Sequence, residues 1–465
     1  MNSLIATAAT MVLIAVLFAW DRDKKVRTSK VLWIPVFWIM IAGSRNVSEW
    51  LQMQGPSDGG NQYLEGSPID RNVLAACEVI ALVALMSGGR RAGKLLRENT
   101  PILMYFAYCG MSVLWADYPF VGIKRWIRAV GDVLMVLVVL TDPNWVAAFK
   151  RFLARAGFVL LPLSILFIRY YPDLGRAYGS SDGTLYWTGV STGKNGLGMI
   201  SQIYGLAALW RLLQVYSGRD ANRKRQLYAN GALLLMAVYL LYESNSMTSL
   251  ACFFMAAGLL IATNFRAVLR KPALVHAMVA AIVFISVGTL FFNMGGAALQ
   301  TMGRDPTLTG RTDVWKMVLA FTVNPVFGAG YESFWLGDRL ARIHVLNPGI
   351  NQAHNGYIEV YLNLGIIGVG LIAIILVTGY RKVIAGLRWD PEIGRLRLAY
   401  FVVGVVYNCT EAGFKMMAAV WILFLLALFT PARMASRNVR TAAPQALPDE
   451  SLADLQAAHT LRAGF

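Results

Sequence analysis

Charged residues are scarce in this sequence. Of its 465 residues only 15% are charged and 57% are hydrophobic, whereas soluble domains average about 25% charged and 45–50% apolar residues. This composition excludes an ordinary soluble protein and predicts an integral membrane protein. The net charge of +17 would suggest a nucleic-acid partner for a soluble protein. Here we expect no such partner, because basic residues at the ends of membrane spans are the usual topology signal.

Patterns that form disulfides or bind metals are also lacking. The four cysteines, Cys77, Cys109, Cys252 and Cys409, lie in or beside apolar runs and form no CxxC pair, so neither a disulfide framework nor a zinc site is predicted. The sole Asp-x-Asp triplet, 21–23, lies beside two lysines and reads as the anchor of a span end. A nucleotide-sugar transferase would normally need such a pair for its metal. We therefore expect no metal and no cofactor.

Apolar runs of about 15–22 residues recur along the chain, close to the ~20 residues that cross a bilayer. The first run has no positively charged region before it, so we interpret it as a span and not as a cleaved signal peptide. Without it the number of spans would be twelve. The prediction is an all-α polytopic membrane protein with about thirteen transmembrane helices, near residues 2–20, 30–44, 72–88, 101–115, 126–141, 152–169, 195–215, 228–242, 247–263, 274–294, 357–380, 397–409 and 414–430.

The segments between these runs alternate in charge. Most of the 43 Lys and Arg residues fall in one alternate set, which the positive-inside rule places in the cytoplasm: 21–30, 89–100, 142–155, 211–228, 264–271, 381–397 and the tail. The predicted organisation is an N-terminal transmembrane bundle (1–294), an outward, periplasmic loop (295–356), C-terminal transmembrane helices (357–430) and a cytoplasmic tail (431–465). We expect the tail to be disordered.

The polar stretch from 302 to 364 is the centre of the predicted function. Its Gly and Pro residues mark tight turns, so we expect a shaped loop with short helices, and ordered loops of this length are usually functional. Charged residues from five separate places in the sequence reach the same outward side, although charge beside a membrane is costly. They are Arg304, Arg311 and His354 in the loop, together with Lys194, Lys124, Arg125, Arg128 and Glu411.

Cations gathered with one histidine beside a bilayer suit the displacement of a lipid diphosphate from a sugar. The leaving diphosphate gains negative charge, which Arg and Lys stabilise most in the transition state. The attacking hydroxyl must lose a proton, and imidazole, with an ordinary pKa near ~6.5, is a suitable acceptor. Attack in one step from the far side would invert the anomeric carbon. These features predict a metal-independent inverting glycosyltransferase.

Several short motifs together resemble the O-antigen ligase and exopolysaccharide polymerase superfamily. In the loop region they are residues 310–315 (GRTDVW), 324–325 with 328–330, 354–357 (HNGY) and 364–368 (LGIIG). Outside it they are 114–119, 194–198, 244–248 and 408–411. The resemblance covers roughly 100–430, and residues 303–315 look most like the exopolysaccharide polymerase branch. Two positions depart from it: Thr192-Gly193 stands where many relatives have a His, and Met247 where ligase-like relatives often carry Arg.

Members of that superfamily are multispan transferases of the bacterial inner membrane, and they act on the periplasmic face. The resemblance implies an undecaprenyl-diphosphate-linked glycan as donor and a glycan acceptor, either a second lipid-linked repeat or lipid A-core. Membrane lipids and the chain-length or export machinery would be the other partners. On this resemblance His354 is the catalytic base, and Arg311 and Lys194 bind diphosphate. Their positions make Arg125, Arg128, Arg304 and Glu411 further candidates for substrate contact.

Each of these residues also has a purely structural alternative. His354 could belong to the cap of the following helix, and Arg311 could brace the loop against Asp305 or Asp313. Lys194 could extend to the lipid headgroups, as could Arg125 and Arg128. Glu411 could do no more than pair with a cation.

Three functional classes stay open at this stage. The first is a polymerase or ligase of lipid-linked glycans, with polymerisation of exopolysaccharide repeats favoured over ligation to lipid A-core and transfer to a protein serine as a third form. The second is a polysaccharide transporter or flippase, which would show internal repeats and broken helices near the midplane. The third is a non-catalytic subunit of an export machine, in which the histidine would be dispensable.

Overall fold

The structure is a computed structural model that describes residues 2–22, 26–52, 66–179, 183–217, 223–291 and 309–429. Helices dominate it, and the two strands pair antiparallel over three residues each. The elements are α1 (Ser3–Asp21), η1 (Lys30–Leu32), α2 (Trp33–Ala42), α3 (Val47–Trp50), α5 (Pro68–Ser87), α6 (Gly89–Glu98), α7 (Thr100–Met111), η2 (Ser112–Trp115), α8 (Pro119–Thr141), α9 (Trp145–Tyr170), α10 (Pro172–Gly175), β1 (Arg176–Tyr178), β2 (Leu185–Trp187), α11 (Lys194–Ser217), α12 (Arg223–Ser244), α13 (Met247–Asn264), α14 (Arg266–Leu269), α15 (Pro272–Phe291), α17 (Thr309–Ala320), α18 (Gly337–Leu346), α19 (Gly356–Trp389), α20 (Pro391–Thr410) and α21 (Ala419–Leu428).

The helices confirm an all-α polytopic membrane protein. Five of those described are long and apolar enough to cross a bilayer, namely α1, α9, α12, α13 and α19, and the bent pair α5 and α6 would make a sixth. Each of the thirteen predicted segments overlaps a helix, although residues 292–294 of the tenth segment lie outside the described residues. The remaining helices are either short or contain buried polar side chains such as Asp132, Gln202 and Arg397, so the number of crossings stays a prediction.

Helices α20 and α21 lie at the centre of the helix packing. All ten residues of α21 are buried, whereas α1 fully buries only Ala6 and Leu17 and leaves most of its other apolar side chains exposed. Gly404 of α20 lets the two central helices approach closely, because a Cβ there would lie 2.3 Å from the Phe424 ring. The centre of the packing is therefore an apolar core, on which the end of α20 is rigidly held.

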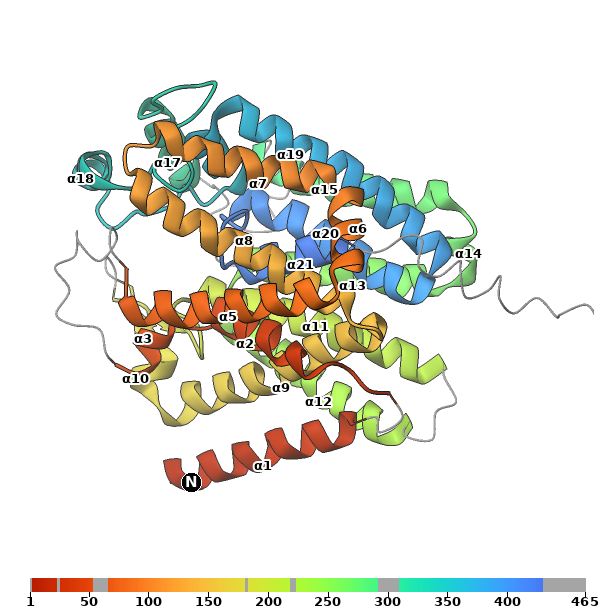
Figure 1. Cartoon of the computed structure of the whole chain (residues 1–465). Helices are drawn as coiled ribbons and strands as arrows, with labels where there is room; N and C mark the ends of the chain where they lie inside the picture. Colours follow the sequence, from red (N-terminus) through yellow and green to blue (C-terminus); the bar gives the residue numbers. More distant parts are fainter. Residues whose placement is uncertain are drawn as a thin grey trace, which may run out of the picture. The chain divides into compact units, whose positions relative to one another are not determined.

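The connecting segments gather at two ends of the helices (Figure 1). At one end, which we call the basic end, Lys382 donates to Asn99, Arg395 to Asn264 and Arg151 to Thr28. At the other, which we call the site end, lie α3, α10, α17 and α18 (Figure 1). There Arg339 pairs with Asp117. This segregation follows the alternation of charge in the sequence.

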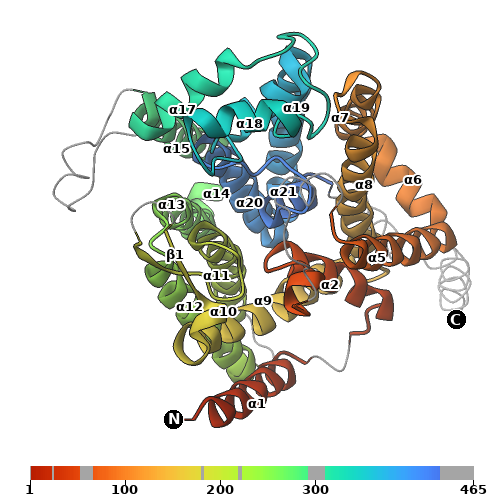
Figure 2. The ribbon, with the colours of Figure 1, turned by 90° about the vertical axis from the view of Figure 1, so that its left-hand side faces the viewer.

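The described part of the polar loop folds on a small core of its own. Trp315 of α17, Ile343 of α18 and Leu362 of α19 meet in it, and Figure 2 shows these three helices side by side. Gly328 and Gly330 have φ angles of 72° and 88°, which glycine adopts without strain. The loop is therefore an ordered segment with short helices, as its Gly and Pro content predicts. Residues 295–308, the first part of the predicted loop, lie outside the described residues.

Helix α19 is broken at Gly365, where φ is 63° and ψ is −164°. An unbroken helix would join Ile366 N–H to the Leu362 carbonyl. Here Ile366 N–H donates instead to the Pro325 carbonyl at 2.9 Å, and the Leu362 carbonyl accepts from Ala329 N–H at 3.0 Å. The loop thus satisfies both backbone groups that the break leaves free, which anchors it next to the start of α19.

Candidate active site

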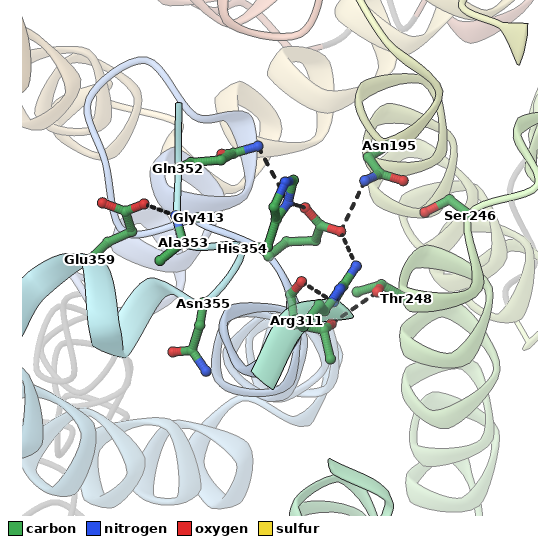
Figure 3. Close-up of polar contacts among 12 residues, drawn as sticks. Asn195, Ser246, Thr248, Arg311, Gln352, Ala353, His354, Asn355, Glu359 and Gly413 are labelled. Atoms are coloured by element: carbon green, nitrogen blue, oxygen red, sulfur yellow. Dashed lines mark hydrogen bonds and ion pairs between the residues drawn. The ribbon is translucent and has the colours of Figure 1, made fainter. Parts of the chain in front are cut away.

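The carboxylate of Glu411 joins three segments that are far apart in sequence, and Figure 3 shows its partners Asn195, Arg311 and His354. Glu411 directly follows α20 and is 4% exposed. Its Oε1 accepts from Arg311 of α17 and from Asn195 of α11, each at 2.9 Å. Its Oε2 lies 3.2 Å from Nδ1 of His354. A buried carboxylate is stable only when paired, and Glu411 has a partner on both oxygens.

The residues on either side of His354 fix its backbone. His354 has a φ of 50°, a left-handed conformation that few residues other than glycine adopt. On one side, the carbonyl of Ala353 accepts from the Trp315 indole at 2.8 Å. On the other, the Asn355 side chain caps α19 by accepting from Tyr357 N–H and Ile358 N–H. Asn355 therefore makes the cap of α19, as the structural alternative for this segment expects, and the His354 imidazole makes its own contact with Glu411.

Glu359 in the first turn of α19 supports the same backbone. Its Oε1 accepts from Ala353 N–H at 2.5 Å, and its Oε2 accepts from the Trp335 indole at 2.9 Å. The polar loop, through Trp335, and α19, through Glu359, thus hold the residue before His354 in place.

Two nitrogen atoms of the Arg311 side chain donate hydrogen bonds to the end of α20. Its Nη2 donates to Glu411, and its Nη1 donates to the carbonyl oxygen of Thr410. The hydroxyl of Thr410 lies 2.9 Å from that of Thr248, in the predicted motif at 244–248. About a quarter of the Arg311 side chain, 27%, stays exposed, so its remaining N–H groups can reach a ligand.

The chain turns sharply after Glu411, and Asn408 forms the turn. Its Oδ1 accepts from Gly413 N–H and from Phe414 N–H, both at 2.8 Å. Gly356 packs against the same amide, where a Cβ would lie 1.9 Å from the oxygen. Because Gly356 has no side chain, the start of α19 can lie directly against the end of α20.

A cavity of about 540 Å³ lies beside Glu411, within the range of ligand pockets, about 300–1,000 Å³. Lys194 lines it and lies over the Tyr186 ring, with Nζ 4.4 Å from the centroid. Lys415 and Tyr407 line it as well. Cations and aromatic rings around one cavity suit a ligand that has both anionic groups and sugar rings.

Burial changes the pKa of Tyr331, a residue of the polar loop. Tyr331 is buried, which raises the pKa of its phenol well above the ordinary value, and the nearby carboxylate of Glu332 raises it further. The phenol therefore stays neutral at physiological pH.

The predicted site residues fall into two groups. His354, Arg311 and Glu411 form one cluster, and Lys194 lines the cavity beside it. Arg125 instead donates to the carbonyl oxygen of Glu332, which braces the polar loop against α8.

The other two predicted cations are not part of the described cluster. Arg128 lies near the carboxylates of Asp70 and Glu78 on α5. Arg304 lies outside the described residues.

Asn195, Gln352 and Lys415 were not predicted as site residues. Asn195 bonds to Glu411, and Gln352 Nε2 lies 3.4 Å from His354 Nδ1. Lys415 is the second residue of the run predicted as a span at 414–430, and a cation at this outward end runs against the positive-inside rule, which was a signal in the sequence. Asn195 lies inside the motif at 194–198 and Gln352 lies two residues before the motif at 354–357, but only the three-dimensional contacts show that both reach the site.

The cluster has the geometry of a general base. When His354 donates from Nδ1–H to Glu411, its Nε2 carries a lone pair and can take a proton. The carboxylate holds the ring in orientation and stabilises the imidazolium once it forms. Within the part of the chain that the structure describes, no three His, Cys, Asp or Glu side chains gather as a metal site.

Comparison with known proteins finds two matches. Residues 231–373 match the family described as O-antigen ligase. The exopolysaccharide production protein ExoQ of Rhizobium meliloti (strain 1021) is 27% identical over 303 residues, which cover 62% of this chain and 66% of that relative. The chain thus matches just under two thirds of the relative's length.

These matches confirm the resemblance to the O-antigen ligase and exopolysaccharide polymerase superfamily. The family match contains Arg311, His354 and the break in α19, whereas Lys194 and Glu411 lie outside it. The cluster therefore combines residues from within the matched region and from outside it.

Proposed function

We propose that this protein is a membrane glycosyltransferase that moves an oligosaccharide from undecaprenyl diphosphate to a sugar hydroxyl. The observation that carries this proposal is the Glu411 carboxylate, which binds His354 with one oxygen and Arg311 with the other beside a cavity of about 540 Å³. The reaction needs an acceptor for a proton and cations for a departing diphosphate. Lys194, Lys415 and Glu411 line this cavity, and Glu411 holds His354 and Arg311 beside it.

His354 acts on the acceptor sugar. Its Nε2 takes the proton of the attacking hydroxyl while Nδ1–H donates to Glu411. The oxygen then attacks the anomeric carbon of the donor from the face opposite the diphosphate, the bond from that carbon to the phosphate oxygen breaks, and the electron pair leaves with the diphosphate. The anomeric carbon inverts, and no covalent intermediate with the protein is needed.

Cations stabilise the leaving group. Lys194 borders the cavity, and Arg311 keeps N–H groups beyond those bound to Glu411 and Thr410. Hydrogen bonds between ionised partners are roughly twice as strong as neutral ones. They strengthen further as charge develops on the diphosphate, which is the role that a metal ion fills in many nucleotide-sugar transferases.

Polymerisation of exopolysaccharide repeats is the favoured form of the reaction, because ExoQ is named for exopolysaccharide production. Ligation of the glycan to lipid A-core is the second candidate, since the matched family is described as O-antigen ligase. The two forms share donor and chemistry and differ only in the acceptor.

We assign the site end of the helices to the periplasmic face of the bacterial inner membrane. The support is the positive-inside rule, together with the contacts between basic segments at the opposite end. On this assignment the tail from residue 431 is cytoplasmic.

Reconstitution tests the proposal. Purified protein in nanodiscs receives an undecaprenyl-diphosphate-linked oligosaccharide, and the release of undecaprenyl diphosphate is measured with either a second lipid-linked repeat or lipid A-core as acceptor. Longer lipid-linked glycan supports the polymerase, and glycosylated lipid A-core supports the ligase. If neither acceptor gives release above an empty-nanodisc control, the protein is not this transferase.

A further inference from the structure

Gln352 connects a cavity lysine to His354. Lys415 Nζ donates to Gln352 Oε1 at 3.3 Å, and Gln352 Nε2 lies 3.4 Å from His354 Nδ1. Lys415 belongs to the turn between α20 and α21, and it lines both the large cavity and a smaller one that also borders Glu359. A single side chain thus spans from the cation to the imidazole.

The lysine determines which way the Gln352 amide faces. An ammonium group can only donate, so the amide oxygen must point at Lys415 and the amide nitrogen at His354. The amide nitrogen is itself a donor, so His354 Nδ1 must accept from it. In a neutral imidazole that accepts at Nδ1, the proton is on Nε2, and Nε2 then has no lone pair with which to act as a base.

Glu411 requires the opposite tautomer. A carboxylate only accepts, so its contact with Nδ1 at 3.2 Å places the proton on Nδ1 and leaves Nε2 free. The same ring nitrogen therefore has two partners with incompatible requirements, Gln352 as a donor and Glu411 as an acceptor. Whichever contact holds decides whether His354 can accept a proton from a sugar hydroxyl.

The surroundings of Lys415 suit an anion. Lys415 is exposed to the cavity that Lys194 also lines. Thr188 lines this cavity too; it is 1% exposed, and its hydroxyl has no hydrogen-bond partner among the described residues. Two ammonium groups and an unsatisfied buried hydroxyl provide the donors that a diphosphate accepts.

We propose, on the premise of the proposed function, that Lys415 binds the donor's diphosphate and that this binding switches His354 to its basic tautomer through Gln352. When the Lys415 ammonium turns from Gln352 to the phosphate, the Gln352 amide loses the partner that fixed its orientation. Glu411 is then the only hydrogen-bond partner of His354 Nδ1 among these residues. Water removes the proton from Nε2 and another water supplies one to Nδ1, so the ring stays neutral. Gln352 is a positioning residue, and the acceptor is activated only after the donor is in place.

Steady-state kinetics in nanodiscs test the binding role. For Lys415→Met we expect the KM for the lipid-linked donor to rise roughly tenfold to a hundredfold, the usual effect of losing a hydrogen bond between charged groups. Inhibition by added undecaprenyl diphosphate should weaken by a similar factor. Lys415→Arg should restore most of the donor affinity and most of the inhibition by undecaprenyl diphosphate. The control is Lys316→Met, which removes an exposed lysine of α17 and should match the wild type. A wild-type KM and wild-type inhibition in Lys415→Met would overturn the proposal.

The source of the anion is tested in the same assay. Membrane phospholipid also carries phosphate, so the nanodiscs are prepared with and without phosphatidylglycerol. If Lys415 serves the donor, this lipid leaves the KM unchanged, whereas competition by phosphatidylglycerol that Lys415→Met removes would assign the residue to headgroups and overturn the proposal.

Nitrogen-15 spectra of the imidazole test the switch without turnover. The chain has 4 His residues, and the His354 signals are those missing in His354→Ala. At a pH where the ring is neutral, we expect undecaprenyl diphosphate to move the proton from Nε2 to Nδ1, and Gln352→Met to show the Nδ1–H form without ligand. If neither undecaprenyl diphosphate nor the Gln352→Met substitution changes the tautomer of His354, the switch is disproved.

The two proposals can fail separately. Loss of transfer in His354→Ala together with wild-type behaviour of Lys415→Met and Gln352→Met would reject the Lys415 inference and keep the transferase. A protein that binds undecaprenyl diphosphate through Lys415 but transfers no glycan to either acceptor would reject the transferase alone. Thermal melting of each variant shows whether a loss comes from unfolding.

Discussion

The side-chain amide of Asn355 donates to the carbonyl oxygen of Cys409 at 3.0 Å. This bond joins the start of α19 to the last turn of α20, one residue after His354 and two residues before Glu411. The same Asn355 side chain caps α19 through its oxygen. One residue thus sets both the helix start and the distance between the imidazole and its carboxylate.

Replacing Asn355 should separate these two roles. Asn355→Ser keeps an oxygen for the cap but is too short to donate to Cys409, so we expect a lower kcat and near-normal thermal stability. Asn355→Ala loses both contacts, and loss of a cap costs about 1 kcal/mol, so its melting temperature should also fall. Kinetics and thermal melting of the two variants provide the test. Equal loss of stability in both would show that the contact with Cys409 is structural only.

Arg311→Lys should lose most activity, about tenfold or more, because a point charge cannot satisfy Glu411 and Thr410 together and still reach a ligand. The matched control is Arg169→Lys, since Arg169 pairs with Glu243 on α12 and its side chain is 50% exposed. That variant should keep full activity. The rate of undecaprenyl diphosphate release measures both variants, and equal rates would remove Arg311 from the site.

Glu411→Gln should reduce kcat by about a hundredfold or more, because a misoriented imidazole in the wrong tautomer is a poor base. The amide has one acceptor and one donor, so its nitrogen must face either Arg311 or His354, which both donate to the carboxylate in the wild type. Glu243→Gln is the control, since its partner Arg169 is exposed. A Glu411→Gln protein with a normal kcat would show that the carboxylate does not orient the ring.

Gly365→Ala should destabilise the protein, whereas Gly370→Ala in the same helix should not. At Gly365 the φ is 63°, and a Cβ would lie 2.2 Å from the carbonyl oxygen of Val326. A positive φ alone costs a residue with a side chain about 1–2 kcal/mol. Gly370 has nothing within 4 Å of its Cβ position. Thermal melting in detergent distinguishes the two, and an unchanged melting temperature in both would mean that the loop does not depend on the break.

The sequence was sufficient to predict the class of fold, because apolar runs and charged connections follow directly from the cost of placing polar groups in a bilayer. All thirteen predicted segments overlap helices. The extent of each helix was less predictable. Residues 414–430 were predicted as one span, yet helix α21 begins only at Ala419, because Asn408 turns the chain after Glu411.

The site was predictable only in its unusual residues. His354 and Arg311 stood out as rare charged groups in a polar loop, and Glu411 as a carboxylate at a span end. His354 and Arg311 share the carboxylate of Glu411, which lies 57 and 100 positions away from them in the sequence. No local sequence pattern encodes contacts over such separations. For the same reason Arg125 was a candidate by position, but it binds a loop carbonyl instead.

The most direct test of the account is the rate of undecaprenyl diphosphate release by His354→Ala, measured beside the wild type in the same nanodiscs with the same donor and acceptor. His344→Ala is the control, because His344 lies on α18 and contacts the carbonyl of Ile350. The account predicts no detectable transfer by His354→Ala, an unchanged melting temperature, and wild-type transfer by His344→Ala. Transfer at the wild-type rate by folded His354→Ala protein would contradict it.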